Sequence, residues 1–574
     1  MFRMIYISLL KFYLHIRVAL DERFAARSRY NHIEIRLGGS YPEEPLVRPP
    51  VPFLGRGVVP TLLDALFLLD EARRDPLLRT VMVRIDPLSV GWARLSDLGR
   101  SLDAIRATGK RVFAYVERPR TAEYVLACHA DEIFMPPTAS LHLTGLRAEV
   151  LFLKDLLDRA GVKAEFLSEG KFKSAAEALT RTDLSKAARE NLDSVLDSIY
   201  SEATAAIARG RKLEPERVAA LVDGGPHLAE KARAAGLVDR CLYRHEARKL
   251  LRDEHGARAV RGGPFAAMAG RRRALRTLAD SGSAIGVLVA DGVIAPDRAS
   301  AFAARQKVVT PRSMRRAIGT LRRDRRVRAV VLRVQSPGGD GLSSDLIHQE
   351  LRRLAESKPL VVSMGDVAAS GGYFLALAGA CVFAEPATLT GSIGVLAGKL
   401  ATGGLYEKFG LRKTVLTRGA NADLDSGYLP FSDTGRARMR EHVEFFYRDF
   451  VAKVAEARKM TPARARKLAQ GRVWTGAQAA EVGLVDALGG LPDAIAEAKR
   501  RAGLPAGTDA PLAVFPRPRP WWRWREDLAF ARVVETVSSA LGLPAQEWRE
   551  AADLASALDP GAPCALLPFR IRIF

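Results

Sequence analysis

The residues of this sequence best suited to chemistry are a serine among small residues and two lysines far from it along the chain. Ser370 lies in Ala-Ala-Ser-Gly-Gly-Tyr (residues 368–373), between two apolar runs. This pattern predicts a strand, a tight turn and a helix that begins beside Ser370. There the Gly371 N–H and the helix dipole would stabilise an oxyanion, with a second donor from Gly338 or Gly339. An isolated Ala-Ser-Gly-Gly is also typical of a serine that caps a helix.

A serine hydroxyl attacks a carbonyl only when a base within about 3 Å accepts its proton. No histidine lies within twenty residues of Ser370 on either side. The apolar-flanked stretch Gly-Lys-Phe-Lys-Ser-Ala-Ala (residues 170–176) offers Lys171 and Lys173 instead. A lysine is a base only when uncharged, and burial lowers a lysine pKa from its usual value of about 10.4. The residues alone do not choose between the two lysines, and both also suit a solvated loop.

Other polar residues are weaker candidates. His348 is a conceivable base, but its charged neighbours predict an exposed helix face. We interpret His129 and His142 as structural, and Asp366 as a residue that caps or orients the turn before Ser370. The sequence has no P-loop and no HExxH motif, and its 4 cysteines lack any CxxC spacing. It therefore predicts no metal and no cofactor.

The elements that must position these residues are short apolar strands separated by stretches long enough for helices. This alternation predicts an α/β fold with parallel strands. The predicted strands are His32–Leu37, Thr80–Ile85, Val112–Val116, Ile285–Ala290, Ala329–Val334 and Leu360–Met364.

Two sets of strands indicate an internal duplication at domain scale. An offset of 249 aligns them without gaps for about ninety residues, with matched glycines, prolines and aromatics that report matched backbone constraints. The copies differ where chemistry is expected: Ser370 corresponds to Thr121, and Lys173 falls opposite Ala422. One copy thus keeps the serine and its glycine turn, and the other keeps the lysine.

Composition limits the classes of partner. The chain of 574 residues carries 88 Lys and Arg against 65 Asp and Glu, a net charge of +23. This charge suits an anionic membrane surface or simply solvated basic faces. No nucleic-acid partner is predicted, because zinc-finger spacing, homeodomain-like helices and RNA-binding aromatic patterns are absent from the sequence.

The first thirty residues predict an amphipathic helix that lies on a membrane. The longest uncharged run, Met4–Leu10, is too short to cross a bilayer. Basic residues fall on one side of the helix and apolar residues, such as Phe12 and Ile16, on the other. The alternatives are a membrane-spanning helix that is interrupted by charged residues and a helix that packs against the following domain. Arg23, Arg27 and Arg29 argue against simple export of the domain beyond them.

Several segments resemble the signal peptide peptidase A (protease IV) family in its long tandem form. The similar segments span both copies: Gly170–Ser185, Ser336–Gly339, Gly365–Phe374, Thr390–Val395 and Gly471–Gly490.

The resemblance implies two tandem crotonase-like ββα domains related to Clp protease, with Ser370 as nucleophile and Lys173 as general base. It further implies that Ser392 holds the lysine, that homotetramers form, and that remnant signal peptides and other short hydrophobic unfolded segments are the substrates. The expected location is the inner membrane, on its periplasmic face. A crotonase-like acyl-CoA enzyme and a non-catalytic assembly scaffold are the alternative functions.

The same reasoning divides the chain into five parts. These are a membrane-associating segment (1–30), a first domain that supplies the lysine (31–254), a linker (255–282), a second domain that supplies the serine (283–510) and a Trp/Arg-rich extension (511–574). The tryptophans and arginines of the extension suit a membrane interface or a tail that packs across a subunit boundary.

Overall fold

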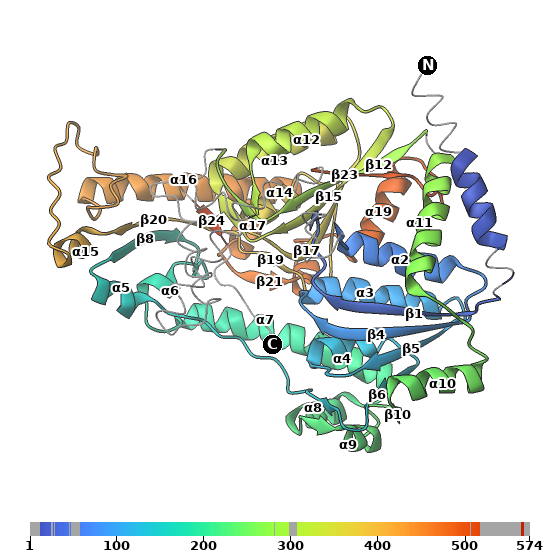
Figure 1. Cartoon of the computed structure of the whole chain (residues 1–574). Helices are drawn as coiled ribbons and strands as arrows, with labels where there is room; N and C mark the ends of the chain where they lie inside the picture. Colours follow the sequence, from blue (N-terminus) through green and yellow to red (C-terminus); the bar gives the residue numbers. More distant parts are fainter. Residues whose placement is uncertain are drawn as a thin grey trace.

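The computed structural model of the chain describes residues 12–23, 27, 29–44, 46–47, 58–279, 282–297, 307–505, 507–516 and 564–566. In this part of the chain, two α/β units lie against each other and share a third sheet (Figure 1). The predicted α/β class is confirmed.

The sheet of the first unit has six strands in the order β10-β6-β5-β4-β1-β11, and all neighbouring strands are parallel. The three predicted apolar runs form its centre, because parallel strands are covered on both faces and need continuous apolar sequence. The strands are β1 (His32–Gly39), β4 (Thr80–Leu88), β5 (Arg111–Val116), β6 (Glu132–Met135), β10 (Arg240–Cys241) and β11 (Ala259–Val260).

The second unit repeats this sheet strand for strand, in the parallel order β22-β18-β17-β15-β12-β23. These strands are β12 (Ala284–Asp291), β15 (Val327–Ser336), β17 (Leu360–Ala369), β18 (Cys381–Ala384), β22 (Ala487–Leu488) and β23 (Leu512–Phe515). The strands β19 (Leu389–Gly391) and β21 (Val473–Thr475) extend the sheet beside β17. The matching order confirms the duplication predicted from sequence.

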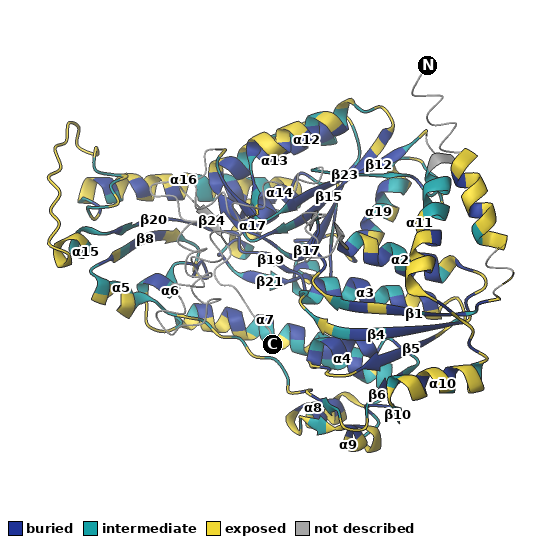
Figure 2. Ribbon diagram, viewed as in Figure 1, coloured by how far each residue is buried: buried dark blue, intermediate teal, exposed yellow. Residues whose placement is uncertain are grey.

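Most of the described helices cover the sheets and turn their apolar sides inward, as the dark inner faces in Figure 2 show, whereas α5 and α15 have no buried residue. Those of the first unit are α2 (Leu62–Arg74), α3 (Trp92–Arg106), α4 (Thr121–Ala127), α5 (Lys154–Ala160), α6 (Glu177–Thr180), α7 (Lys186–Arg211), α8 (Pro215–Asp223), α9 (Ala229–Ala234), α10 (Arg244–His255) and α11 (Gly262–Ala279). Those of the second unit are α12 (Pro311–Arg323), α13 (Gly341–Ala355), α14 (Gly371–Ala376), α15 (Gly403–Lys408), α16 (Asp433–Ala457), α17 (Pro462–Leu468), α18 (Gly476–Glu481) and α19 (Leu491–Arg501).

The third sheet joins the two units in the order β14-β13-β16-β24-β20-β8. Its strands are β8 (Lys163–Glu169), β13 (Val293–Ile294), β14 (Val308–Val309), β16 (Gly338–Asp340), β20 (Val395–Ala401) and β24 (Cys564–Leu566). Seven residue pairs link β8 of the first unit to β20 of the second in antiparallel register. The remaining strands form two ribbons, β2 (Leu46–Val47) with β3 (Val58–Val59) and β7 (Ser140–Leu141) with β9 (His227–Leu228).

Charged side chains bridge the two units away from the third sheet. The guanidinium of Arg333, on β15, is 1% exposed and lies 2.9 Å from a carboxylate oxygen of Glu43 and 3.6 Å from one of Asp97. It also donates to Ser363 Oγ and to the carbonyl oxygen of Met364. Because a buried charge without its partners is strongly destabilising, this cluster favours one relative placement of the units.

A helix at residues 12–23 packs beside α11, and Arg271 of α11 pairs with Asp21 at 2.7 Å (Figure 1). Leu14 and Val18 of this helix are buried, whereas Phe12, Ile16 and Leu20 are exposed; residues 1–11 lie outside the described residues. Among the helices that the structure describes, none has the length and apolar character to cross a bilayer.

Candidate active site

Ser370 lies in the turn between β17 and α14. Its φ of 54° and ψ of −113° are values that residues with a Cβ rarely adopt. Backbone hydrogen bonds hold this conformation, because its N–H donates to Gly391 O at 2.7 Å and its carbonyl accepts from Phe374 N at 2.8 Å. The hydroxyl caps no helix N–H. Helix capping therefore does not explain this serine, and strained backbone of this kind concentrates at functional sites.

Lys173 reaches Ser370 from the first unit. Its Nζ lies 2.8 Å from Ser370 Oγ, although the two residues are 197 positions apart in sequence. The lysine is 5% exposed and the serine is 0% exposed. A positive-φ turn at Gly170 ends β8, and the N–H of Phe172 donates to the carbonyl of Gln470 at 2.7 Å in the second unit. The backbone before the lysine is thus anchored on the unit that carries the serine.

The structure distinguishes the two candidate lysines. The side chain of Lys171 is 63% exposed, and its Nζ lies 3.6 Å from a carboxylate oxygen of Glu190. Phe172, between the two lysines, is buried, as is Lys173 itself. Lys173 is therefore the lysine that meets the serine.

Ser392 completes a buried group of three side chains. Its Oγ lies 3.0 Å and its carbonyl oxygen 3.1 Å from Lys173 Nζ. Its φ is 49°, and its N–H donates to the carbonyl of Arg472 at 2.7 Å. A neutral amine has two N–H donors and one lone pair. With both oxygens of Ser392 accepting, the lone pair is left for the hydroxyl of Ser370.

The three predicted oxyanion glycines gather beside the serine. A Cβ built on Gly371 would lie 3.2 Å from Gly338 Cα, and one built on Gly339 would lie 2.0 Å from Ile294 O. Only glycine fits such close backbone approach. The N–H of Gly338 donates to Ser336 Oγ at 3.2 Å, whereas Gly371 opens α14. Gly371 thus presents the helix N-terminus to the serine, as the sequence predicted.

Two glycines that sequence reasoning missed shape the space around the lysine. A Cβ on Gly394 would lie 3.2 Å from Lys173 Cδ, and a Cβ on Gly471 would lie 2.6 Å from Lys173 N. Both glycines stand in the segments that carry the family resemblance, which was the signal that could have found them. Because these glycines lack a Cβ, Lys173 can pack directly against the backbone on both sides.

The prediction of an exposed His348 is wrong. This residue is 2% exposed and meets the ring of Phe374 edge-on, with 5.2 Å between ring centroids. Burial lowers the pKa of His348 to about 4. Its Nδ1 is buried and has no hydrogen-bond partner among the described residues. The side chain packs as an aromatic residue of the core behind α14.

Asp366 also differs from its predicted role. Its carboxylate accepts from the backbone N–H groups of Gly91 (3.2 Å) and Arg94 (3.0 Å), and it pairs with the Arg94 side chain. It therefore caps α3 of the other unit and does not orient the turn at Ser370. Asp366 lies on β17 before that turn, at the interface between the two units, and this position explains the difference.

The other two histidines lie in the first unit, away from the three-residue group. His129 Nδ1 lies 2.8 Å from a carboxylate oxygen of Asp103, and His142 is exposed, with its backbone N–H donating to Pro119 O at 2.9 Å. Neither is among the groups that the structure brings to Ser370.

Both units match one family of known proteins. The model of peptidase family S49 matches residues 104–258 and 352–505. Each matched segment lies in one of the two units, the first containing Lys173 and the second Ser370 and Ser392. The chain belongs to peptidase family S49. It is accordingly a serine peptidase, a hydrolase of peptide bonds.

Relatives of this S49 peptidase match most of its length. The chloroplastic serine protease SPPA of Arabidopsis thaliana is 33% identical over 452 residues, which are 78% of this chain and 67% of the relative. Protease 4 of Salmonella typhi is 33% identical over 416 residues, 71% of this chain and 66% of the relative. Protease 4 of Haemophilus influenzae is 27% identical over 455 residues, 76% and 72% of the two chains. The matched part of the S49 peptidase thus spans about two thirds of the length of the first two relatives.

Proposed function

We propose that this S49 peptidase is an endopeptidase in which Ser370 is the nucleophile and Lys173 its general base. The observation that carries the proposal is the buried contact of 2.8 Å between Lys173 Nζ and Ser370 Oγ. A hydroxyl and an amine at this distance, shielded from water, meet the geometric requirement for proton transfer. Ser392 orients the amine through its two oxygens.

The reaction follows from this geometry. Uncharged Lys173 accepts the hydroxyl proton as Ser370 Oγ forms a bond to the carbonyl carbon of the substrate. The oxyanion faces the N–H of Gly371, with a second donor from the Gly338–Gly339 turn. The protonated lysine then gives its proton to the departing amine, and the peptide bond breaks. Water deprotonated by the same lysine attacks the acyl-enzyme, which releases the acid and restores the serine.

The proposed substrates are remnant signal peptides and other short, unfolded hydrophobic segments at a membrane. Phe12, Ile16 and Leu20, exposed on one helix, support attachment to a membrane surface. Relatives with the name Protease 4 come from bacteria, and we propose the periplasmic face of the inner membrane as the location. No cofactor is part of this mechanism.

We further propose that the chain forms a homotetramer. The support is the arm made by β8, β20, α5 and α15, which projects from the units in Figure 1. Large apolar side chains in the segment that follows α15 are exposed, with Phe409 at 75% and Leu416 at 86%. Clustered exposed apolar residues mark interaction surfaces, and a second copy of this chain is the partner we propose.

The proposed dyad is tested by labelling with a fluorophosphonate and by cleavage of a quenched hydrophobic peptide. Ser370→Ala is expected to abolish both signals. Lys173→Met, which keeps the length of the stem, is expected to lower kcat by at least about 100-fold. Lys171→Met is the matched control, because it removes an exposed lysine two positions away. Normal cleavage by Lys173→Met would contradict the assignment of the base.

A further inference from the structure

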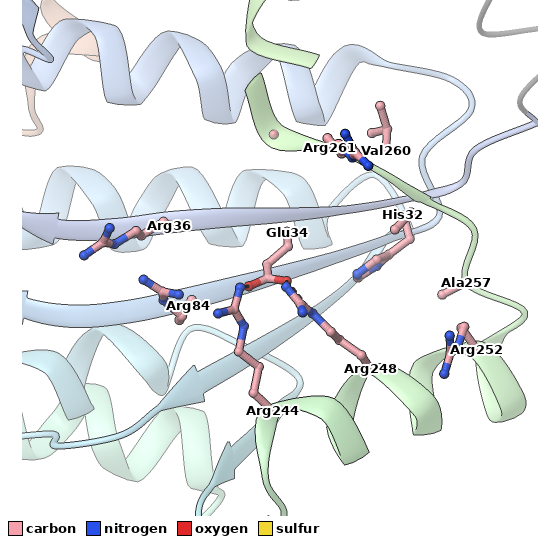
Figure 3. A pocket seen from close by; sticks show the side chains of 12 residues that line it. His32, Glu34, Arg36, Arg84, Arg244, Arg248, Arg252, Ala257, Val260 and Arg261 are labelled. Carbon is pink, nitrogen blue, oxygen red and sulfur yellow. Dashed lines mark hydrogen bonds and ion pairs between the residues drawn. The ribbon is translucent and has the colours of Figure 1, made fainter. Parts of the chain in front are cut away.

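A cavity on the open side of the first sheet is lined mainly by arginines. It has a volume of about 560 Å³ and lies between β1, β4, α10 and the start of α11 (Figure 3). Cavities of this size hold small molecules, and this lining favours a molecule with negative charge. The arginines that line the cavity are Arg36, Arg84, Arg244, Arg248, Arg252 and Arg261.

The carboxylates at this cavity neutralise only part of its positive charge. Glu34 and Asp86 each pair with two of the arginines. Arg252 and Arg261 form no ion pair within the described part of the chain. Six positive charges thus meet two negative ones. In addition, the Nε of Arg244 is buried and has no hydrogen-bond partner among the described residues.

The start of α11 brings main-chain donors to the same cavity. This helix of 18 residues begins at Gly262, which lines the cavity, and continues with Gly263 and Pro264. The N–H groups of a first helical turn have no partner within the helix, and the helix dipole makes this end attractive to anions. A Cβ built on Gly263 would meet nothing within 4 Å, so the space beside this turn is open. A helix N-terminus at glycines is a common binding place for phosphate groups.

His32 is the most deeply buried polar side chain of the cavity. It is 4% exposed, and its Nδ1 lies 2.9 Å from Thr80 Oγ1. Burial lowers the pKa of His32 to about 4, so the ring is neutral near pH 7. The positive charge of the cavity therefore comes from arginines, which stay charged at any physiological pH.

We propose that this cavity binds a phosphate ester, either the headgroup of an anionic lipid or a soluble phosphate ester. Planar guanidinium groups bind phosphate oxygens in pairs, and the volume leaves room for an organic group beside the phosphate. A lipid source is consistent with helix 12–23, which exposes Phe12, Ile16 and Leu20 and ends nine positions before His32. The proposal does not depend on the peptidase chemistry.

The test measures binding to the full-length chain at one ionic strength. Inorganic phosphate is titrated in a calorimeter, and vesicles of phosphatidylglycerol or of phosphatidylcholine are sedimented with the protein. Arg252→Gln with Arg261→Gln removes two charges from the cavity and breaks no ion pair within the described part of the chain. Arg316→Gln with Arg323→Gln is the matched control, because it removes two exposed arginines of α12 that likewise have no ion pair there.

The cavity variant is expected to bind at least about tenfold more weakly than the wild type, since hydrogen bonds to charged groups are strong, and the α12 variant is expected to bind normally. Binding to phosphatidylglycerol vesicles then identifies a lipid source, and binding to inorganic phosphate alone identifies a soluble one. Equal losses in the two variants would mean that only net charge matters, and would overturn the proposal. Absence of binding to every probe would overturn it as well.

A different observation carries a second inference, on the segment that supports the proposed base. Residues 470–473 of the second unit lie against Lys173, and a Cβ built on Gly471 would lie 2.6 Å from the lysine N. The carbonyl of Arg472 accepts from the N–H of Ser392 at 2.7 Å. This segment thus contacts both the lysine and the serine that holds its amine.

Asn191 of α7, in the first unit, binds the end of this segment. Its Nδ2 donates to the carbonyl of Val473 at 2.7 Å, and its Oδ1 accepts from the N–H of Val473 at 2.8 Å. The asparagine is 0% exposed, and the two residues are 282 positions apart. Loss of this side chain would leave two buried main-chain groups without their partners.

We infer that Asn191 is a positioning residue of the proposed active site. It acts through Val473, which holds residues 470–473 against Lys173 and Ser392. The inference rests on the proposed roles of these residues. A misplacement of about 1 Å at a catalytic group can lower the rate about 100-fold. Loss of Asn191 should therefore lower kcat and leave KM unchanged, because this buried side chain contacts the segment and not the substrate.

The test compares two variants that each break a contact between α7 and β21. Asn191→Leu removes both hydrogen bonds to Val473 at similar volume. Ser198→Ala is the matched control, because Ser198 Oγ lies 2.7 Å from Thr475 Oγ1, two residues beyond Val473. Titration with a fluorophosphonate gives the fraction of labelled sites, and kcat is expressed per labelled site.

A merely structural role would lower the labelled fraction and leave kcat per labelled site normal. The inference expects kcat per labelled site to fall at least about tenfold in Asn191→Leu and to stay normal in Ser198→Ala. A normal value in Asn191→Leu, or an equal fall in the control, would overturn the inference.

Hydrogen exchange separates this inference from the proposed chemistry. In the Ser370→Ala background, exchange of the Ser392 amide is compared with and without Asn191→Leu. Faster exchange in the double variant supports the positioning role even if Ser370 is not the nucleophile. Unchanged exchange overturns it even if the enzyme is active. If the leucine variant does not fold, Asn191→Ser, which leaves room for water, takes its place in both experiments.

Discussion

Removal of the Ser392 hydroxyl is the perturbation that tests most directly how the lysine is held. Ser392→Ala deletes the acceptor 3.0 Å from Lys173 Nζ and leaves the carbonyl acceptor of the same residue at 3.1 Å. The amine then has one fixed N–H instead of two. It can rotate about the remaining bond, so its lone pair is aligned with Ser370 Oγ for a smaller part of the time.

The substitution removes one hydrogen bond to the amine, and this sets the expected magnitude. One hydrogen bond contributes about 1 kcal/mol net, and 1.4 kcal/mol corresponds to a factor of about ten in rate. The kcat of Ser392→Ala should therefore fall about fivefold, with KM unchanged because Ser392 faces the lysine and not the substrate. Loss of the proposed base, in Lys173→Met, should lower kcat at least about 100-fold.

The assay is steady-state cleavage of a quenched peptide together with the rate of fluorophosphonate labelling. Ser363→Ala is the control, since that buried hydroxyl accepts from Arg333 at 2.8 Å and does not touch the lysine. A fall in kcat as large as that of Lys173→Met would mean that Ser392 does more than orient the amine. A raised KM with normal kcat would mean that it contacts the substrate, and either result refutes the reasoning.

Three further substitutions test the surroundings of the site. Gly394→Ala places a methyl group 3.2 Å from Lys173 Cδ and 2.8 Å from Glu169 O. Its kcat should fall at least about tenfold, with an unchanged circular dichroism spectrum. A normal kcat would refute the role given to Gly394. Burial lowers the pKa of His348 to about 4. The neutral imidazole therefore makes its full contribution to the free energy of unfolding above pH 6.5. This contribution is lost as the pH falls from about 6.5 toward 4, and the loss is about 2 kcal/mol at pH 5. His348→Phe should remove this part of the acid sensitivity in urea unfolding at pH 8 and pH 5, and equal pH dependence in the two proteins would contradict it. Burial beside Asp97 raises the pKa of Glu385 to about 9, so the free energy of unfolding declines as the pH rises from about 4.5 toward 9. Glu385→Gln stays neutral, and its Tm should fall less between pH 6 and pH 9 than the Tm of the wild type. An equal or larger fall would argue against a protonated Glu385.

The strands and the duplication were predictable from sequence because their signals are local. Continuous apolar runs follow from burial on both faces of a parallel sheet, and matched glycines keep one offset through both copies. The contact between Lys173 and Ser370 has no such local signal, since it joins residues 197 positions apart. Only the family resemblance selected Lys173 over Lys171. The physical reason appears in three dimensions, where burial of Phe172 and the turn at Gly170 direct one lysine inward.

The burial of His348 could have been predicted from the spacing of apolar and small residues on its helix. Charged neighbours suggested an exposed face, but Ser344, His348 and Leu351 follow one another at spacings of four and three residues and are all buried. Helical spacing would therefore have placed the histidine inward. The role of Asp366 had no equivalent signal, because the N–H groups that it caps belong to α3 of the other copy.

The place of the lysine depends on the register of a single strand pair. Val395 of β20 is opposite Glu169 of β8, so Lys173 and Ser392 lie a few residues beyond the same end of this pair. A slip by one residue would move the lysine by about 3.4 Å along the strand, more than the hydrogen-bond distance to Ser370. It would also turn every side chain of β8 to the opposite face.

Glycines prevent that slip. A Cβ on Gly398 would lie 2.2 Å from the ring of Phe166, and Gly161 and Gly404 approach each other so closely that a Cβ on either would lie within 2.8 Å of the other's backbone. Only the observed register brings residues without a Cβ to these points. Because each copy contributes one strand of the pair, neither copy alone can place a lysine against a serine. The contact between Lys173 and Ser370 is therefore a property of the interface between the copies. The absence of the serine from one copy and of the lysine from the other leaves that interface intact.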